Sequence, residues 1–159
     1  MEDLCKKKIM KPFIVLIVAF GLSLLGTKFM MGNFEFAFSG RIAMSVMLIF
    51  TAFAHFAFTK GMAMMLPDFV PYKIEMVYLT GIMEIAFAIG LLIPGIRVMV
   101  AWLLILFLII VLPANIYASV KQINYQNGSF DGNGLAYLWF RIPLQILFIV
   151  WTYLSSVNA

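Results

Sequence analysis

The sequence predicts an all-α membrane protein, built as a four-helix transmembrane bundle with one additional N-terminal transmembrane helix. Of its 159 residues, 64% are hydrophobic and 11% are charged, whereas soluble domains carry roughly 45–50% apolar and about 25% charged residues. Five apolar stretches each approach or exceed the roughly 20 residues that a helix needs to cross a bilayer. These stretches cover residues 12–31, 39–58, 74–93, 97–120 and 134–156. No internal repeat is visible, so we expect one domain over 1–159, with an anchor helix in 1–38 and a four-helix core in 39–157.

The first stretch follows a basic segment, as an uncleaved membrane anchor does. Four lysines near the N-terminus equal the whole formal net charge of +4. A basic cluster beside an apolar segment orients a membrane protein and contacts anionic lipid, so we expect membrane lipid and no nucleic acid as a partner. Pro12 suits the first turn of this helix, because its missing N–H has no helical partner there. The single cysteine, Cys5, excludes an intrachain disulfide.

Lysines and arginines also predict how the chain is oriented. With the N-terminus in the cytoplasm, the inner segments hold Lys6, Lys7, Lys8, Lys11, Lys60, Lys73 and Lys121, and the outer ones hold Lys28, Arg41 and Arg97. The positive-inside rule therefore favours a cytoplasmic N-terminus and an outer C-terminus.

The connections between the remaining stretches differ in character. The segment at 59–73 is apolar with two prolines and is expected at the membrane interface. The "LIPGIR" junction at 92–97 is a tight turn, so the third and fourth stretches should be antiparallel neighbours. The segment at 121–134 is polar and rich in turn-forming residues.

Each of the four core stretches carries one polar stripe. Residues spaced by three and four lie on one helix face. Lipid cannot satisfy polar side chains, so the stripes are expected to face one another. They comprise Arg41, Ser45, Leu48, Ala52, His55 and Thr59; Thr80, Gly81, Glu84 and Ala88; Asn115, Ser119 and Gln122; and Leu138, Arg141, Gln145, Phe148, Thr152 and Ser155.

Glu84 is the group in these stripes that most needs a partner, because it falls near the middle of its span. Arg141 is its expected ion-pair partner, and the small residue Gly81 should let another helix approach closely. Pro113 and Pro143 free backbone groups that polar side chains can pair. The predicted site is a polar cavity lined by Arg41, His55, Glu84, Asn115, Arg141 and Gln145.

The motifs "GRIAMSVMLIFTAFAHF", "MLPDFVPYKIEMVYLTGIMEIAFAIGLLIPGIR", "LPANIYASV" and "RIPLQ" occur in this order between about Gly40 and Trp151. In this respect the chain resembles the DoxX family of small bacterial membrane proteins. The resemblance implies a four-helix transmembrane bundle in the bacterial inner membrane. It also implies a link to redox membrane complexes, including subunits of a thiosulfate to quinone oxidoreductase. The additional first helix departs from the family's usual plan.

Two functions from different classes follow. In the first, the polar cavity binds a quinone or lipid-like molecule, its arginine and histidine side chains hydrogen-bond the carbonyl oxygen, and Glu84 exchanges the proton. In the second, the chain is a non-catalytic accessory subunit of a larger inner-membrane complex, and the polar groups fix helix register. A single histidine makes a poor metal site, so no metal and no covalently bound cofactor is expected. The sequence leaves open whether the protein is an enzyme.

Overall fold

The computed structural model describes residues 11–132 and 134–159, and it contains helices and turns but no strand in those residues. The elements are α2 (Lys11–Met31), α3 (Phe36–Ala57), α4 (Thr59–Met64), α5 (Lys73–Gly90), α6 (Arg97–Val120), α7 (Leu135–Thr152) and the π-helix η1 (Tyr153–Val157). Each predicted apolar stretch thus became a helix within a few residues of its expected bounds. Cys5, Lys6, Lys7 and Lys8 lie outside the described residues.

Four of the helical segments are long and apolar enough to cross a membrane. They are α2, α3, α6, and the continuous segment Leu138–Val157 of α7 and η1. The chain therefore has the character of a helical membrane protein. The helix α5 differs because its 18 residues include Lys73, Glu75 and Glu84.

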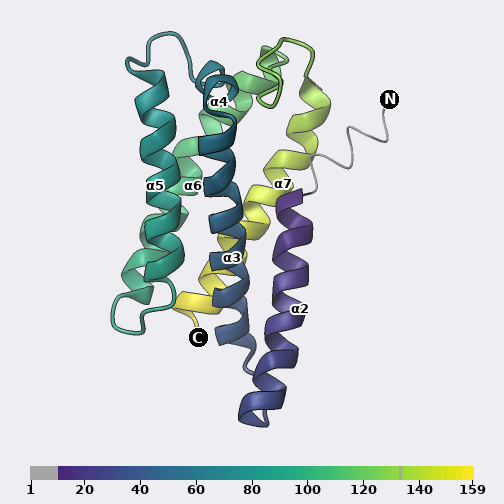
Figure 1. Ribbon diagram of the computed structural model, residues 1–159, viewed down its shortest axis with the longest axis vertical. Coiled ribbons are helices and arrows are strands. Elements are labelled where there is room, and N and C mark those ends of the chain that lie inside the picture. Colours follow the sequence, from purple (N-terminus) through teal and green to yellow (C-terminus); the bar gives the residue numbers. More distant parts are fainter. Residues whose placement is uncertain (1–10, 133) are drawn as a thin grey trace.

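The long helices run up and down along one another (Figure 1). The helix α3 packs against α2 on one side and α5 on the other, and α6 packs against α7. A tight turn follows α5, in which the Arg97 backbone N–H donates a hydrogen bond to the Ile93 carbonyl. The next helix, α6, therefore runs antiparallel to α5 and contacts it, as predicted. Short α4 and the segment 121–134 lie together at one end of the molecule (Figure 1).

The core is apolar and lies toward the end opposite α4. Buried side chains from α3, α5, α6 and α7 form most of it, together with Leu16 of α2 and with Leu91 directly after α5. Leu16, Met44, Leu91 and Leu104 are each 0% exposed. Glycines allow close helix contacts beside this core: a Cβ on Gly90 would lie 2.7 Å from a Val100 methyl group. The arrangement leaves many large apolar side chains on the outside, as a lipid-facing surface requires.

The helix α2 has a different environment from the rest. It packs chiefly on α3, and only Leu16 and Thr27 among its residues are buried. Its C-terminal end projects beyond the neighbouring helices (Figure 1), and Phe29 and Met30 at that end are each 88% exposed. Such a helix adds little to the core and presents most of its surface to the surroundings.

Candidate functional site

The predicted stripe on α3 faces inward, as expected. Ser45, Leu48 and Ala52 are buried, and the Ser45 hydroxyl donates a 2.7 Å hydrogen bond to the Ala88 carbonyl of α5. The stripe on α7 and η1 behaves in the same way, since Gln145, Phe148, Thr152 and Ser155 are all buried. Helical spacing alone thus identified the inner faces of both elements.

The structure brings four of the six predicted site residues together in two pairs, His55 with Glu84 and Asn115 with Gln145, and it places Arg41 at the other end of α3. Arg41, near the start of α3, donates a 2.8 Å hydrogen bond to the Ser155 carbonyl of η1. His55 stands fourteen positions further along the same helix, which corresponds to about 21 Å of helical rise. Arg41 therefore cannot share one small-molecule site with His55. Arg141 lies on α7, which packs against α6 and α3.

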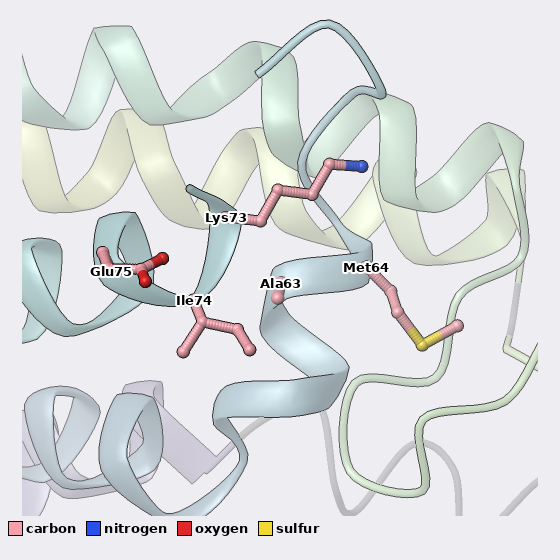
Figure 2. A pocket seen from close by; sticks show the side chains of 5 residues that line it. All are labelled: Ala63, Met64, Lys73, Ile74 and Glu75. Carbon is pink, nitrogen blue, oxygen red and sulfur yellow. The ribbon is translucent and has the colours of Figure 1, made fainter. Parts of the chain in front are cut away.

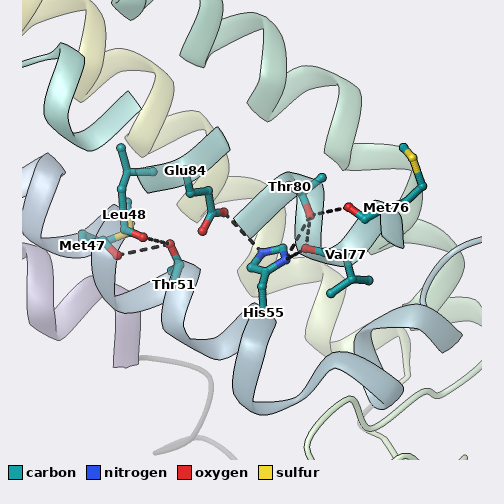
Figure 3. A network of polar contacts seen from close by, with 8 residues as sticks. All are labelled: Met47, Leu48, Thr51, His55, Met76, Val77, Thr80 and Glu84. Atoms are coloured by element: carbon teal, nitrogen blue, oxygen red, sulfur yellow. Dashed lines mark hydrogen bonds and ion pairs between the residues drawn. The ribbon is translucent and has the colours of Figure 1, made fainter. Parts of the chain in front are cut away.

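The structure brings His55 and Glu84 together across the α3–α5 interface (Figure 3). The His55 Nε2 atom lies 3.5 Å from Glu84 Oε1. Here the structure gives Glu84 a different partner from the expected Arg141, because α5 packs mainly on α3. Gly81 permits this approach, since a Cβ there would lie only 2.9 Å from the Cβ of His55. The prediction that Gly81 allows close helix contact is confirmed.

Two groups contact Nδ1 of the His55 ring. The Nδ1 atom lies 3.1 Å from the Val77 carbonyl oxygen and 3.1 Å from the Thr80 hydroxyl. A carbonyl oxygen can only accept, so the Val77 contact is a hydrogen bond in the tautomer that carries its hydrogen on Nδ1. The Thr80 hydroxyl donates to the carbonyls of Met76 and Val77, at 3.0 and 2.9 Å, and in the other tautomer it can donate to Nδ1. In the Nδ1–H tautomer, Nε2 is the basic nitrogen, and it faces Glu84.

Glu84 itself is 9% exposed, and its second oxygen, Oε2, is buried with no hydrogen-bond partner. When Nδ1 carries a hydrogen, the carboxyl group and Nε2 can share one further proton. The proton gives either a neutral carboxylic acid beside a neutral imidazole or a carboxylate beside an imidazolium. The net charge of the pair is zero in both states, which lowers the cost of burying it.

Asn115 and Gln145 meet in a separate cluster between α6 and α7. The Asn115 amide donates a 3.4 Å hydrogen bond to Gln145 Oε1, and the Ser119 hydroxyl donates to the Asn115 carbonyl. The Gln145 amide donates to the Leu108 carbonyl. Pro113 lacks the N–H that would bond the Ile109 carbonyl, so the carbonyl it releases is the one next to Leu108. That a side chain pairs the released carbonyl itself stays a prediction.

Two surface depressions lie away from these clusters. One, of about 410 Å³, is lined by Ala63, Met64, Lys73, Ile74 and Glu75, between α4 and the start of α5 (Figure 2). The other, of about 350 Å³, lies beside Phe20, Gly40 and Trp151. Neither is lined by any of the six predicted residues. In the part of the chain that the structure describes, no group of three or more histidine, cysteine or acidic residues could hold a metal ion.

Two contributors were not assigned a role from the sequence. Thr80 was placed on the same helix face as Glu84, one turn before it, but was not included in the predicted site. Trp151 donates a 3.0 Å hydrogen bond from Nε1 to the Gly40 carbonyl, and its ring stacks edge-on against Phe20 of α2. Its position within an apolar helix gave no polar signal.

Comparison with known proteins gives one match. Residues 44–156 match a family described as a domain of unknown function, DUF8561. The match runs from within α3 to η1, so α2 lies outside it. Neither the curated proteins nor the solved structures yield a match. The chain therefore belongs to the DUF8561 family.

Proposed function

We propose that this protein is a five-span membrane protein whose Glu84–His55 pair exchanges a proton with a small lipid-soluble ligand of the quinone type. The observation that carries the proposal is the state of the Glu84 carboxyl group. One of its oxygens lies 3.5 Å from His55 Nε2, and the other is buried without a hydrogen-bond partner. A buried oxygen of this kind is available to a ligand carbonyl or hydroxyl group.

The proposal treats α5 as the fifth span of a bundle. The helix contains 18 residues, about 27 Å of rise, which is close to the thickness of a bilayer core. It follows α3 along much of its length, from the Ser45–Ala88 contact to the contact of His55 with Val77. Glu84 also belongs to a neutral pair, which offsets the main cost of placing it in the membrane.

Orientation is part of the same proposal. Lys60, Lys73 and Lys121 belong to the end of the molecule that holds α4 and the segment 121–134, and Lys28 and Arg97 belong to the other end. The positive-inside rule favours the α4 end in the cytoplasm and the C-terminus outside, in a bacterial inner membrane. We further propose a DoxX-like, redox-associated role, on the strength of the ordered motifs around Arg41, His55, Glu84, Asn115 and Arg141.

The test compares two identical chemical changes on α5. Glu84→Gln removes the titrating group but keeps its shape, and Glu75→Gln makes the same change at an exposed position near the helix start. Binding of ubiquinone-1 and of menadione to the protein in lipid nanodiscs is measured by titration. We expect Glu84→Gln to weaken binding about tenfold or more, and Glu75→Gln to bind like the natural chain.

Two outcomes would count against this function. If the natural chain binds neither quinone, the ligand class is wrong. If Glu84→Gln binds as well as Glu75→Gln, Glu84 does not belong to the ligand site.

The second candidate function is that of an accessory subunit of a larger membrane complex. It is favoured because other polar side chains form hydrogen bonds within the chain: Arg41 donates to the Ser155 carbonyl, and Asn115 donates to Gln145. Polar groups used in this way hold helices in register and leave none for a ligand. Under this function Glu84→Gln lowers stability or assembly without changing quinone binding.

A further inference from the structure

The surroundings of the Glu84–His55 pair differ between its two sides, along the axis of α3 and α5. Toward α4 the pair meets polar groups, beginning with the Thr80 hydroxyl 3.1 Å from His55 Nδ1. Toward the other end it meets the apolar core. We infer that protons reach Glu84 from the α4 end alone, through Thr80 and His55, and do not continue across the molecule. The inference rests on the proposed function, because it takes the pair to be proton-exchanging.

The polar side forms a continuous series of contacts. The hydroxyl of Thr80, which is partly exposed, contacts His55 Nδ1, and the Nε2 atom across the same ring faces Glu84 Oε1 at 3.5 Å. Figure 3 shows the three side chains in this order. In the tautomer with its hydrogen on Nε2, the ring takes a proton from the Thr80 hydroxyl at Nδ1 and releases the Nε2 proton to Glu84. The ring then carries its hydrogen on Nδ1, and Thr80 regains a proton from its exposed side.

The α4 end can supply such a proton. Thr59 donates a hydrogen bond to the His55 carbonyl there. The charged side chains on the elements next to that end of α5 are Lys60 of α4, Lys73 and Glu75 of α5, Asp68 between these helices, and Lys121 after α6. Asp68 and Lys73 form an exposed ion pair at 2.8 Å, so this end meets water or lipid headgroups.

The opposite side offers no proton carrier among the described residues. The side chains beyond Glu84 in that direction include Leu48, Met44, Ala88 and Leu91, which are at most 2% exposed. Thr51 and Ser45 are the hydroxyl groups of α3 on this side of His55. Thr51 bonds the Met47 and Leu48 carbonyls and Ser45 bonds the Ala88 carbonyl, so neither makes the hydrogen bond to a titratable group that Thr80 makes to His55. A closely packed apolar layer excludes the water that proton transfer would need.

Thr80→Val tests the polar route, since valine matches threonine in shape but lacks the hydroxyl group. The readout is the carbonyl stretching band of protonated Glu84, identified by its loss in Glu84→Gln, and the rate at which D₂O shifts it. We expect Thr80→Val to slow this shift by about tenfold or more. Thr80→Ser restores the hydroxyl and should restore the rate. Thr51→Val is the matched control, because Thr51 bonds only carbonyls of its own helix, those of Met47 and Leu48.

A shift in Thr80→Val as fast as in the natural chain would overturn the route. So would the absence of a Glu84 carboxyl band throughout the pH range in which the protein stays folded. A second measurement tests one-sidedness: liposomes that contain the protein and an internal pH dye should take up protons no faster than protein-free liposomes. A faster uptake that Glu84→Gln abolishes would show a path across the membrane.

These outcomes are separable from those of the quinone experiment. Slow exchange in Thr80→Val together with unchanged quinone binding in Glu84→Gln would support the proton route and reject Glu84 as part of a quinone site. Loss of quinone binding in Glu84→Gln together with normal exchange in Thr80→Val would support the ligand and reject the route.

Discussion

The α3–α5 interface and the α6–α7 interface each contain a pair of polar side chains, but the two pairs differ in whether all their buried polar atoms have hydrogen-bond partners. Between α6 and α7, the Asn115 amide bonds Gln145, and the Gln145 amide bonds the Leu108 carbonyl. Between α3 and α5, the Glu84 carboxyl group contacts His55 with one oxygen and leaves the other buried without a partner. Neither side chain of the first pair has a buried nitrogen or oxygen atom without a partner. The second pair retains bonding capacity at one carboxyl oxygen.

This difference suggests how to separate structural polar groups from reactive ones inside an apolar helical protein. Neutral amide side chains that hydrogen-bond one another stabilise helix packing at little cost in desolvation free energy. A carboxyl group with an unpartnered buried oxygen costs stability, so another benefit is expected to maintain it. On this reasoning the α3–α5 interface is the candidate site and the α6–α7 interface is its support.

The largest expected effect comes from closing the approach between α3 and α5. In Gly81→Ala the added Cβ would lie 2.9 Å from the His55 Cβ and 3.4 Å from the Phe56 ring. Overpacking of this kind costs roughly 1–3 kcal/mol. We expect a loss of that size in the free energy of unfolding, measured in detergent by circular dichroism.

Gly21→Ala provides the control, because a Cβ at that position on α2 meets nothing within 4 Å. Both changes gain helix propensity, by up to about 1 kcal/mol. The difference between the two variants therefore isolates the contact with His55. Equal stability of both variants would mean that Gly81 does not set the spacing of α3 and α5.

A smaller effect should distinguish the two polar pairs directly. Double-mutant cycles with leucine replace His55 and Glu84 in one set and Asn115 and Gln145 in the other. Removing one partner of the first pair strands a buried ionisable group, so we expect a coupling energy of about 1–3 kcal/mol. The amide pair should give about 0.6 kcal/mol. Equal coupling energies, measured by unfolding in detergent, would remove the distinction between the interfaces.

The smallest expected effect concerns the exposed ion pair between Lys73 and Asp68, outside the membrane spans. It is an exposed reference for the His55–Glu84 pair, whose contribution to stability should be larger because Glu84 is buried. The Lys73 ammonium group donates a hydrogen bond to Asp68 and lowers the pKa of that carboxyl group below its ordinary value of 3.8. A lowered pKa in the folded state stabilises the fold above about pH 3.8, and this contribution disappears as the pH falls through the lower, folded pKa. Because Asp68 is fully exposed, the effect on stability should be slight.

An NMR titration of the Asp68 carboxyl carbon measures this shift. We expect a midpoint below 3.8 in the natural chain and a midpoint closer to 3.8 in Lys73→Gln. If Lys73→Gln leaves the midpoint unchanged, the ion pair does not form in solution.

Much of the secondary structure could be predicted because apolar run length and helical spacing are local properties. The bounds of α2 and α6 match the predicted stretches 12–31 and 97–120 to within one residue. The short helix α4 was missed, because its six residues are too few to show a periodic pattern. The inward faces of α3 and α7 were also predicted correctly, since three- and four-residue spacing places side chains on one face wherever the helix lies.

The partner of Glu84 could not be predicted in the same way. The sequence placed Glu84, His55 and Arg141 on inner faces of three helices, and an arginine was the stronger charge partner. Which of them approaches the carboxyl group depends on which helix is the neighbour of α5. In the structure that neighbour is α3, and His55 Nε2 lies 3.5 Å from Glu84 Oε1. The helices can approach this closely because Gly81 has no side chain to contact His55.

Composition and helical period are enough to show that the chain is helical and apolar, which faces of α3 and α7 point inward, and that a carboxyl group lies in one of the apolar stretches. These features need no knowledge of neighbouring helices. The packing of the helices was needed to show that Glu84 pairs with His55, that Asn115 pairs with Gln145, and that Arg41 lies at the far end of α3. Contacts between helices depend on their order and spacing in three dimensions, which a one-dimensional pattern leaves undefined.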